Sequence, residues 1–562
     1  MYILGISAYY HESSIALIKK DKIICFIKEE WLTRIKGDNS FPRNAILFIK
    51  KKYKISNSNL DLVCYYEKPF TSWWKLFKYS INRPIANKDF LINHVKNFTN
   101  SSIFFKRDLN KEIKISSNKV VFSSHHLSHA LYALSIVKKK KDYAVLSIDG
   151  VGEGITSSIF NIKEKEIECI DFTTYPNSLG LFYSIITDFM GFGINEDEYK
   201  VMSLSSYGKP VFYNKVSKIF DKKKFQLKEN YIRFHKSIDQ SFSKDLIKIF
   251  GTPFLSLNNK NNFKKYSNIA CSAQKILEET IDLLVKKTLK VTKKSKIIIC
   301  GGVALNCKAI TNVAKKNKKI FFVVPPSPGD SGSAIGAAAY ANYLKQKKIN
   351  FFHSSPFIGP DRKSNLDIRL FNLMFKKIGN ENHANNFIYK VFLKGGIIAT
   401  YLSKSEIGPR ALGNTSLICD GLNKKSVRYL NTKIKNRDFF QPLAPIILEK
   451  NFNKFFLKEK NIFNNHKWMS VLAKAKKKCY RKIKPILHID KTARVQTVNN
   501  DFPIYTLLNY LDKKNMKILV NTSFNISKDP IVFDINDVYV NMKRLGLLYL
   551  YCFGKIYKIR NL

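Results

Sequence analysis

Apolar residues in the first part of the chain fall into short runs, each of which ends at a turn. Met1–Ala8 (MYILGISA) predicts a buried strand, and a polar turn separates it from two further strands at Ser14–Lys19 and Lys22–Lys28. The same order recurs where a strand at Ala144–Gly150 (AVLSIDG) runs into a glycine-containing turn and then into a strand at Ile155–Ile162. This repetition predicts two similar half-domains.

A third apolar strand, Lys296–Cys300 (KIIIC), runs into Gly301 and Gly302, and a helix is predicted to start near Ala304. Backbone N–H groups at such turns and at helix N-termini hold phosphate. Two hairpins followed by a Gly-Gly turn indicate the layout of the actin-like ATPase superfamily. A Pro/Gly turn and a small-residue helix at 327–340 (SPGDSGSAIGAAAY) are expected to end this part of the chain.

A linker with Pro356, Gly359 and Pro360 precedes the second part of the chain. The pattern after this linker predicts a mixed α/β region. Its expected elements are a strand at Gly396–Leu402, a helix at Val427–Lys433, a strand at Lys517–Asn521 and a helix at Ile535–Arg544.

The chain is strongly basic. Its 562 residues include 96 Lys+Arg and 43 Asp+Glu, which gives a formal charge of +53, while the 45% of hydrophobic residues are typical of a globular protein. The charge has two readings, a polyanionic partner such as nucleic acid or an anionic membrane, or a lysine-rich drift in composition. Lysine runs such as 138–141 and 476–478 are spread over the whole chain, which favours drift and a solvated surface.

Cysteine spacing and hydropathy indicate a reducing compartment. The chain has nine cysteines and no C-x-x-C pair, which fits neither a disulfide framework nor a zinc ribbon. The N-terminal apolar stretch is interrupted by His11 and Glu12, unlike a signal peptide, and no run of 18 apolar residues is present. We therefore expect a cytoplasmic protein without membrane insertion.

A histidine cluster at 124–130 (SHHLSHA) is the strongest candidate for chemistry. His125 and His129 are four residues apart, so on a helix they share one face and can bind one metal ion. Asp149 and Asp330 lie at separate turns and are natural further donors. This donor set suits Fe(II), Zn(II) or Mn(II). The alternative is that the histidines cap a helix or are solvated.

His11 lies at the tip of the first hairpin, where it is suited to act as a base or to orient an acceptor hydroxyl. The alternative is a turn histidine that makes a local hydrogen bond.

Basic and amide residues cluster near turns in the second part of the chain. Arginine and lysine side chains that converge on a cavity suit a triphosphate and a second small anion. For any one of these residues a surface salt bridge is the alternative, but together they favour a polyphosphate site. The candidates are Arg410 in IGPRALGN, Lys435 and Arg437, Arg494 in HIDKTARVQT, and Asn521, Ser523 and Asn525 in NTSFN.

The chain resembles the NodU/CmcH-type O-carbamoyltransferases, which include enzymes that carbamoylate nodulation factors, cephamycin and tobramycin. The resemblance runs almost end to end. It rests on ILGISAYYHESSIAL, EEWLTRIKGDNSFPRNAI, SHHLSHA, LSIDGVGEG, SLGLFYS, DEYKVMSLSSYG, GGVALNCKA, SPGDSGSAIGAA, IGPRALGN, HIDKTARVQT and NTSFNISKDPIV.

This resemblance implies an α/β protein with two domains and a linker. Residues 1–350 are expected to form a duplicated actin-like carbamoyl-transfer domain, 351–384 a linker region, and 385–562 a YrdC-like domain that forms carbamoyl-AMP. The implied reaction activates carbamoyl phosphate with ATP, releases pyrophosphate, and then moves the carbamoyl group to a hydroxyl of a sugar or sugar-containing metabolite.

The resemblance also implies roles for individual residues. The implied metal ligands are His125, His129 and Asp330, with Asp149 beside the metal and the adenylate and with Fe(II) favoured; His11 is placed near the acceptor. Gly301, Gly302 and Asn306 match the adenosine-binding turn. The synthase-domain positions are Arg410, Lys435, Arg437, Arg494, Asn521, Ser523 and Asn525.

Several positions depart from the family pattern. The QGR that commonly precedes EFGPRALGNR is Leu402, Ser403 and Lys404 here, GNR ends in Thr415, and the arginine of RPFAP is Gln441. Lys404 keeps a charge but lacks the bidentate fork of arginine. Two alternatives for the function follow from the charge and the fold, a tRNA-modifying or RNA-binding relative of the threonylcarbamoyl transferases and a sugar kinase. The second domain and the histidine pair favour the small-molecule carbamoyltransferase over both.

Overall fold

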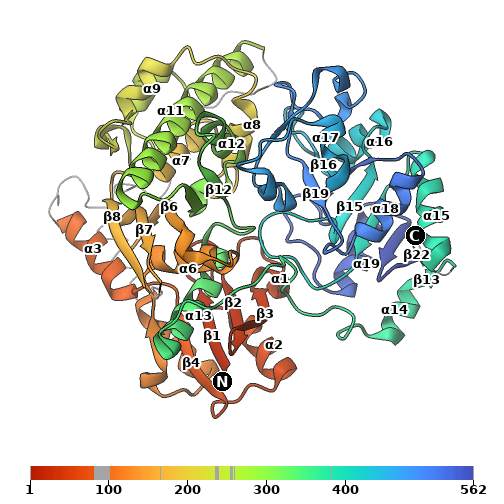
Figure 1. Cartoon of the computed structure of the whole chain (residues 1–562), viewed down its shortest axis with the longest axis horizontal. Helices are drawn as coiled ribbons and strands as arrows, with labels where there is room; N and C mark the ends of the chain where they lie inside the picture. The colour runs from red at the N-terminus through yellow and green to blue at the C-terminus, as the bar shows by residue number, and fades with distance from the viewer. Residues whose placement is uncertain are drawn as a thin grey trace. The chain divides into compact units, whose positions relative to one another are not determined.

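The computed structural model describes residues 2–81, 102–164, 166–234, 240–253, 257, 260–379 and 381–560. Internal contacts divide the chain into two compact units (Figure 1). Unit 1 consists of Met1–Ile24 and Asn39–Ser354, and unit 2 of Cys25–Asp38 and Ser355–Leu562. The short segment 25–38 therefore belongs with the C-terminal part of the chain.

Unit 1 contains two five-stranded sheets with the same strand order. One runs β3-β2-β1-β4-β5 and the other β8-β7-β6-β11-β12. In the first sheet β1 and β2 form an antiparallel hairpin, and β4 and β5 run parallel to β1. In the second sheet β6 and β7 form the hairpin, and β11 and β12 run parallel to β6. The predicted pair of similar half-domains and the actin-like fold class are confirmed by this duplicated order. The bounds are β1 Tyr2–Ser7, β2 Ser14–Lys19, β3 Lys22–Lys28, β4 Leu60–Tyr65, β5 Val120–Phe122, β6 Tyr143–Gly152, β7 Ile155–Ile162, β8 Ile167–Thr174, β11 Lys296–Cys300 and β12 Phe321–Val323, with a small pair β9 Phe220–Asp221 and β10 Gln226–Leu227.

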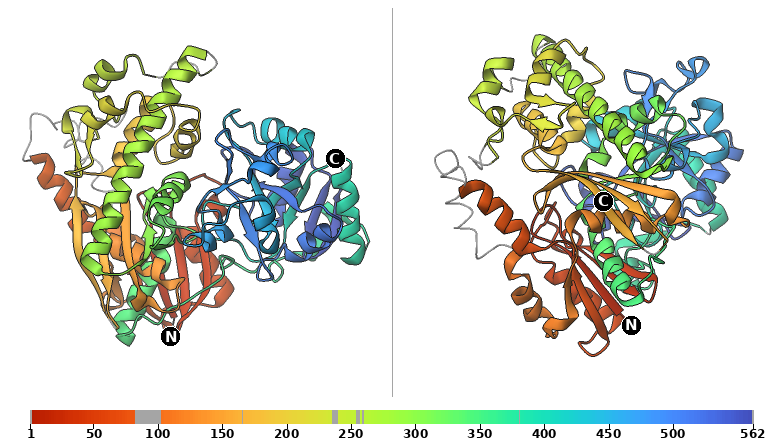
Figure 2. Two further views of the ribbon diagram at one scale, coloured as in Figure 1. Left: turned by 45° about the horizontal axis from the view of Figure 1, so that its top comes forward. Right: turned by 60° about the vertical axis from the view of Figure 1, so that its left-hand side comes forward.

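Two helices lie side by side between these sheets, α6 (His125–Ser135) and α13 (Asp330–Gln346), and α13 also packs on β1 (Figures 1 and 2). Their small residues allow the close approach. A Cβ at Gly336 would lie 1.7 Å from the Ser128 carbonyl oxygen, and one at Gly5 would lie 2.0 Å from that of Ala334. The predicted small-residue helix is thus the element that brings Asp330 to the histidine helix.

Helices α7 and α11 pack on β6 and α2 packs on β2, and the 33-residue α11 also packs on α7, α8, α9 and α12. The helix predicted near Ala304 begins instead with a 3-10 turn, Gly302–Leu305, and α12 follows because Asn306 caps it through the Ala309 N–H. The bounds are α2 Arg43–Tyr53, α3 Pro69–Ile81, α5 Phe105–Glu112, α7 Leu179–Phe189, α8 Glu198–Leu204, α9 Tyr213–Ile219, α10 Lys244–Phe250, α11 Lys260–Thr292 and α12 Cys307–Lys316.

Unit 2 is built on an eight-stranded mixed sheet with the order β13-β22-β21-β14-β15-β20-β16-β19. The mixed α/β region is confirmed, and α19 (Ile535–Arg544) has its predicted bounds. The helix predicted at Val427–Lys433 is α16 (Lys424–Tyr429), continued by a π-helical turn at Leu430–Ile434. The other bounds are α1 Glu30–Thr33, β13 Phe375–Lys377, β14 Ile398–Tyr401, β15 Thr415–Asp420, β16 Ala444–Leu448, β17 Ala473–Lys474, β18 Thr492–Ala493, β19 Gln496–Val498, β20 Ile518–Ser523, β21 Tyr549–Cys552, β22 Lys555–Ile559, α14 Ile368–Met374, α15 Glu381–Leu393, α17 Phe452–Phe455 and α18 Tyr505–Lys513.

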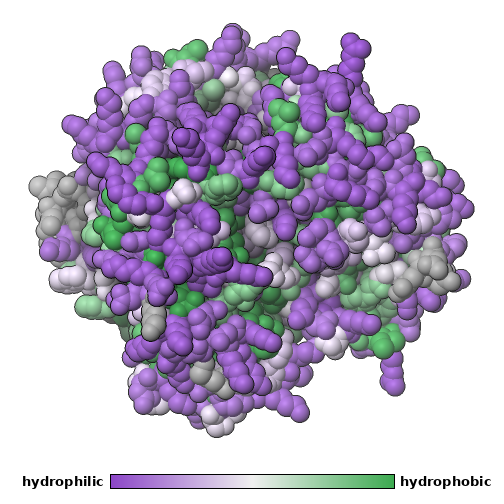
Figure 3. All heavy atoms as spheres, viewed as in Figure 1, coloured by the Kyte–Doolittle hydropathy of each residue, from purple (hydrophilic) through white to green (hydrophobic). Residues whose placement is uncertain are grey.

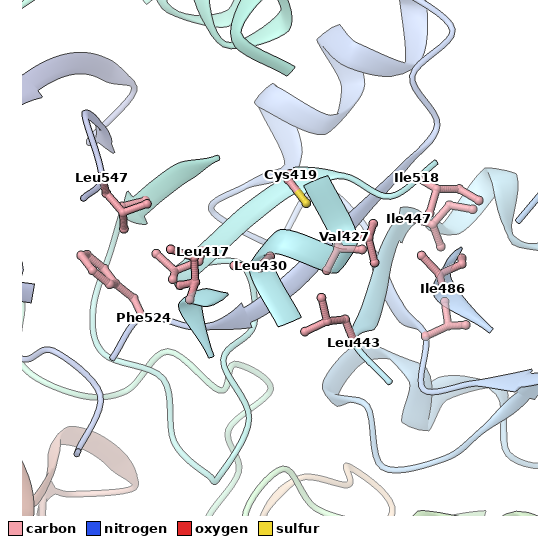
Figure 4. Packing of buried hydrophobic residues seen from close by; sticks show 14 of the residues in the cluster. Leu417, Cys419, Val427, Leu430, Leu443, Ile447, Ile486, Ile518, Phe524 and Leu547 are labelled. Atoms are coloured by element: carbon pink, nitrogen blue, oxygen red, sulfur yellow. The ribbon is translucent and has the colours of Figure 1, made fainter. Parts of the chain in front are cut away.

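The sheet of unit 2 is apolar on both faces. Leu417 and Cys419 of β15 belong to one hydrophobic cluster (Figure 4), whereas Ile418, between them in sequence, belongs to the cluster on the other face. Successive side chains of a strand point to opposite faces, so the central strands are covered on both sides. The polar residues at the ends of β15 and β20 are therefore carried by central strands that are buried on both faces.

The face shown in Figure 3 is mainly hydrophilic, with small scattered apolar patches. Among the residues that the structure describes, no helix combines the length and the apolar character needed to cross a membrane.

Candidate functional site

Four predicted metal ligands come together in unit 1. His125 and His129 lie one turn apart on α6, both fully buried, and Asp330 is the first residue of α13. Asp149 lies in β6, where the pairing with β7 is irregular between Ile148 and Gly152. Such a bulge re-aims side chains, and here it turns Asp149 toward the histidines.

The donor atoms of this cluster fit one metal ion. The two Nε2 atoms are 3.1 Å apart, and each lies 3.0 Å from Oδ2 of Asp149. Oδ1 of Asp330 is 3.3 Å from His129 Nε2 and 3.7 Å from His125 Nε2. Metal–ligand bonds of about 2.1 Å place neighbouring donors about 3.0–3.4 Å apart. His125, His129, Asp149 and Asp330 are therefore spaced as ligands of a single ion.

The backbone of neighbouring turns holds Asp149 in place. Oδ1 of Asp149 accepts hydrogen bonds from the N–H groups of Gly150 and Gly302, which leaves Oδ2 to face the histidines. A Cβ at Gly152 would lie 2.1 Å from Cδ2 of His125, so a larger residue there would displace the ring. The Gly-Gly turn after β11 is thus part of the metal site, whereas adenosine binding by Gly301, Gly302 and Asn306 stays a prediction.

The electrostatics of the cluster favour a cation. Burial raises the pKa of Asp149, but hydrogen bonds with His125 and His129 outweigh it and hold the pKa well below its usual range. Burial lowers the pKa of His129, yet hydrogen bonds with Asp149 and Asp330 raise it to about 9. Without a metal the site therefore attracts protons, and a metal ion would replace them.

Further polar groups surround the two imidazole rings. Nδ1 of His129 lies 3.1 Å from Oγ of Ser333, and Nδ1 of His125 lies 3.9 Å from the Glu67 carboxylate. Glu153 accepts a hydrogen bond from the backbone N–H of His125 at the start of α6. The sequence analysis missed Glu67 and Glu153. Glu67 follows the buried strand β4 after one residue, Tyr66, and an acidic residue after a buried strand is the same signal that identified Asp149.

The structure fixes His11 at the tip of the β1–β2 hairpin. Nε2 of His11 donates a hydrogen bond to the carbonyl oxygen of Asn195, 2.8 Å away, which leaves Nδ1 as the basic nitrogen of the neutral ring. The hydroxyl of the adjacent Tyr10 approaches Gly150 beside the metal ligands, because a Cβ on that glycine would lie 3.9 Å from it. Asn39 binds the carbonyl of Tyr10 and so supports the tip. Tyr10 was not predicted.

A second polar cluster lies in unit 2, at the end of β20. Nζ of the buried Lys435 donates to the carbonyl oxygens of Ser523 and Asn525, at 3.1 and 2.8 Å, and to the Asn525 side-chain oxygen at 2.6 Å. Arg437 donates to Oγ1 of Thr522 at 3.0 Å. The predicted Lys435, Arg437, Ser523 and Asn525 are therefore brought together by β20 and the π-helical turn.

Asn521, in the same strand as Ser523, connects this cluster to the segments that contain the predicted Arg410 and Arg494. Asn521 donates hydrogen bonds to the carbonyl oxygen of Ala411, next to Arg410, and to the side-chain oxygen of Gln496, close to Arg494. Oδ1 of Asn521 and Nε of Arg494 are among the buried polar atoms that have no hydrogen-bond partner in the part of the chain that the structure describes. Buried polar atoms of this kind call for a bound partner. The contacts of Arg410 with substrate stay a prediction.

Burial changes the acidity of Lys435. Burial lowers its pKa and the nearby charge of Arg437 lowers it further, to about 7, with a contribution from Lys36 of the segment 25–38. A lysine in this state gains its proton readily when an anion arrives. The cluster is therefore suited to bind phosphate or carboxylate oxygens.

A buried arginine lies beside the position where the expected motif arginine is replaced by Thr415. Nη2 of Arg362 donates to Oγ1 of Thr415 at 2.6 Å, and the guanidinium stacks over the ring of Tyr401. Thr415 in turn donates to the buried carboxylate of Glu406, which lies 4.0 Å from Arg362. The sequence analysis missed Arg362, which stands in the linker after Gly359 and Pro360.

We expect Arg362→Met to destabilise unit 2. The change leaves the Glu406 carboxylate buried without its neighbouring cation, and breaking a buried pair in this way costs about 3–5 kcal/mol. Differential scanning calorimetry should show an earlier unfolding transition, and Arg362→Met with Glu406→Gln should recover part of the loss because no uncompensated charge remains. A single variant as stable as the wild type would contradict this role.

Comparison with known proteins defines the class of this chain. The family model "Carbamoyltransferase N-terminus" matches residues 2–339, and "Carbamoyltransferase C-terminus" matches residues 390–557. The chain belongs to the carbamoyltransferase family and is an enzyme of the transferase class. The family predicted from the sequence motifs is thereby confirmed.

Individual relatives agree with this assignment. The nodulation protein NolNO of Sinorhizobium fredii is 25% identical over 546 residues, covering 94% of this chain and 76% of that protein. The 3'-hydroxymethylcephem-O-carbamoyltransferase of Streptomyces clavuligerus is 27% identical over 249 residues, covering 43% and 44%. An uncharacterized protein of Synechocystis is 29% identical and covers 98% of this chain and 95% of its own length.

Solved structures give weaker likenesses. The activator of the 2-hydroxyisocaproyl-CoA dehydratase from Clostridium difficile aligns with a TM-score of 0.34 at 13% identity, over 62% of this chain and 96% of that one. HypF of T. kodakarensis aligns with a TM-score of 0.32 at 15% identity, over 63% and 49%. We therefore base the fold of unit 1 on its strand order.

Proposed function

We propose that this protein is an ATP- and metal-dependent O-carbamoyltransferase that uses carbamoyl phosphate and modifies a hydroxyl of a sugar or sugar-containing metabolite. The observation that carries the proposal is the presence of two different sites in one chain. Unit 1 holds a nitrogen- and oxygen-donor cluster, and unit 2 holds a buried cationic cluster around Lys435. The name of the cephem relative, which specifies O-carbamoylation, supports a hydroxyl acceptor.

The first step is activation in unit 2. Carbamoyl phosphate gives up its phosphoryl group to water as inorganic phosphate, and the resulting carbamate oxygen attacks the α-phosphorus of ATP. A new O–P bond forms, the bond between the α- and β-phosphates breaks, and pyrophosphate leaves. Lys435 and Arg437 supply positive charge to the crowded phosphates. Asn521, with Oδ1 lacking a partner, and Arg494 are assigned to the same ligands.

The second step is transfer in unit 1. The acceptor oxygen attacks the carbamoyl carbon of the adenylate, the bond from that carbon to the AMP oxygen breaks, and AMP leaves with a carbamate ester as product. His11 is assigned the proton of the acceptor hydroxyl, because the hydrogen bond from Nε2 to Asn195 leaves Nδ1 as the basic atom. His125, His129, Asp149 and Asp330 would hold the metal ion, which supplies Lewis-acid polarisation of the reacting carbonyl.

The donor set limits the choice of metal without selecting one. Two imidazole nitrogens and two carboxylates suit Fe(II), Zn(II) or Mn(II), and the family resemblance favours Fe(II). We assign transfer to residues 1–350 and activation to residues 385–562, with 351–384 as the linker region. The contribution of segment 25–38 to unit 2 is the exception to this division.

The experiment that tests the proposal is product analysis with ATP, carbamoyl phosphate and a divalent metal, in the absence of an acceptor. We expect pyrophosphate release that requires carbamoyl phosphate. Arg410→Ala should reduce this release on the order of 10- to 100-fold, because a charge-assisted hydrogen bond to an anion contributes about 1.5–3 kcal/mol.

Arg369→Ala is the matched control, because Arg369 is an exposed arginine of the same unit, on α14. It should release pyrophosphate at the wild-type rate. If the folded, metal-loaded wild type releases none, the proposed activation is wrong; if Arg410→Ala is as active as the control, the assignment of Arg410 is wrong.

A further inference from the structure

Segment 25–38 begins in the second half of β3 and is grouped with unit 2. Its backbone is tied there, because the N–H of Phe26 donates to the carbonyl oxygen of Ile358 at 2.9 Å. Trp31 is buried and its ring stacks on that of Phe533, with the centroids 5.7 Å apart. The backbone hydrogen bond of Phe26 and the ring contact of Trp31 tie the segment to unit 2.

The segment is also braced internally. The buried Glu30 carboxylate binds Lys28 and Lys36 and accepts a hydrogen bond from the N–H of Gly37 at 3.0 Å. Arg34 lies inside this closed turn, in the left-handed backbone conformation with φ of 61°. The backbone position of Arg34 is therefore held by the contacts of Glu30 within the segment.

The Arg34 guanidinium binds three oxygen atoms of the segment that follows β20. Nη1 donates to the carbonyl oxygen of Ile531 and Nη2 to that of Pro530, both at 2.9 Å. Nη1 also lies 3.0 Å from the carboxylate of Asp537, near the start of α19. The planar fork of arginine suits this divergent set, which a lysine ammonium does not reproduce.

The loop that Arg34 holds leads directly to Lys435. The carbonyl oxygen of Asp529, next to Pro530, accepts a hydrogen bond from the side chain of Asn525 at 2.5 Å. Both the backbone and the side-chain oxygens of Asn525 accept hydrogen bonds from Lys435. Arg34 is thus connected to the Lys435 ammonium through one short loop, residues 525–531.

We propose that Arg34 is a positioning residue of the activation site, which holds loop 525–531 so that Asn525 and Lys435 keep the geometry for the substrate anion. This inference rests on the proposed function for its effect on activity, but the restraint on the loop is independent of it. A displacement of about 1 Å in such a site costs on the order of 100-fold in rate. A residue that the sequence analysis assigned to the first domain, Arg34, therefore belongs to the activation site of the second.

The test combines hydrogen exchange with activity on the full-length protein. In Arg34→Ala we expect amide exchange in a peptide covering 525–533 to be at least several-fold faster than in the wild type. We also expect kcat/KM for carbamoyl phosphate in pyrophosphate release to fall on the order of 10- to 100-fold. Arg34→Lys should be intermediate in both measurements, and it serves as the test if Arg34→Ala does not fold.

Arg43→Ala is the matched control, because Arg43 pairs with Glu112 in unit 1, a short distance along the same part of the chain. It should match the wild type in both measurements. Unchanged amide exchange in the peptide covering 525–533 overturns the inference, whatever happens to the rate of pyrophosphate release. Faster exchange with an unchanged rate also overturns it. A wild type without pyrophosphate release instead overturns the proposed function, while the exchange comparison still decides whether Arg34 restrains the loop.

Discussion

His125→Ala is expected to remove most of the bound metal and to slow carbamoyl transfer strongly, while leaving carbamoyl-phosphate-dependent pyrophosphate release intact. Nε2 of His125 is 3.1 Å from that of His129 and 3.0 Å from Asp149, so its loss removes one donor from the centre of the cluster. Lewis-acid polarisation is worth several kcal/mol, and each 1.4 kcal/mol is about tenfold in rate. The transfer step should therefore slow on the order of a thousandfold.

The measurement has two parts. Metal analysis after desalting should give about one ion per wild-type chain, as expected for one four-ligand centre, and much less in His125→Ala. Transfer is best followed with carbamoyl-AMP supplied directly, so that activation in unit 2 is not needed. The metal content decides the ligand assignment even when no acceptor is known.

His126→Gln is the matched control on the same helix. His126 is as buried as its neighbours, but its ring nitrogens face Ser158 and the carbonyl oxygen of Ile155, and it is not one of the clustered donors. Burial and the charge of His125 lower its pKa to about 3, so it is neutral at physiological pH. Full metal content in His125→Ala, or its loss only in His126→Gln, would show that the ligand set is wrong.

Much of the metal site was predictable from the sequence because its signals are local. The spacing of His125 and His129 fixes one helix face, and Asp149 and Asp330 follow apolar runs and turn residues that set their positions. Glu67 and Tyr10 were not predicted, because their roles depend on which strand ends and hairpin tips lie side by side. That information comes from the sheet order and not from any single segment.

In unit 2, too, contacts between segments that are distant in the sequence could not be predicted. The cluster of Lys435, Ser523 and Asn525 was predicted as a group of polar residues near turns, but its geometry depends on a π-helical turn that no pattern indicated. Arg34 lies in a segment assigned to the first domain, and Arg362 lies in the predicted linker region. Their functional contacts span 497 and 53 residues of sequence, and one sequence carries no signal for such pairs.

Lys435→Met is expected to lower kcat/KM for carbamoyl phosphate on the order of 100-fold, because it removes a buried cation whose hydrogen bonds to an anion contribute about 1.5–3 kcal/mol. Lys433→Met is the matched control, since Lys433 is an exposed lysine of the π-helical turn that ends just before Lys435. Pyrophosphate release at several carbamoyl phosphate concentrations separates the two. Equal loss in both variants would show that the turn, and not the Lys435 charge, is needed.

The pH dependence gives a second, independent test of Lys435. Burial, followed by the charge of Arg437, lowers its pKa to about 7, so the free enzyme loses this charge as the pH rises through 7 and kcat/KM should then fall about tenfold per pH unit. Lys435→Arg stays charged, so its kcat/KM should not fall in this pH range. A wild-type rate that is flat from pH 6 to 9 would remove Lys435 from the binding of the anion.

The lowered pKa of Lys435 also predicts how stability depends on pH. Between about 7 and the usual value of 10.5 the unfolded chain binds more protons than the folded chain, so the free energy of unfolding should rise with pH across this window in the wild type and not in Lys435→Met.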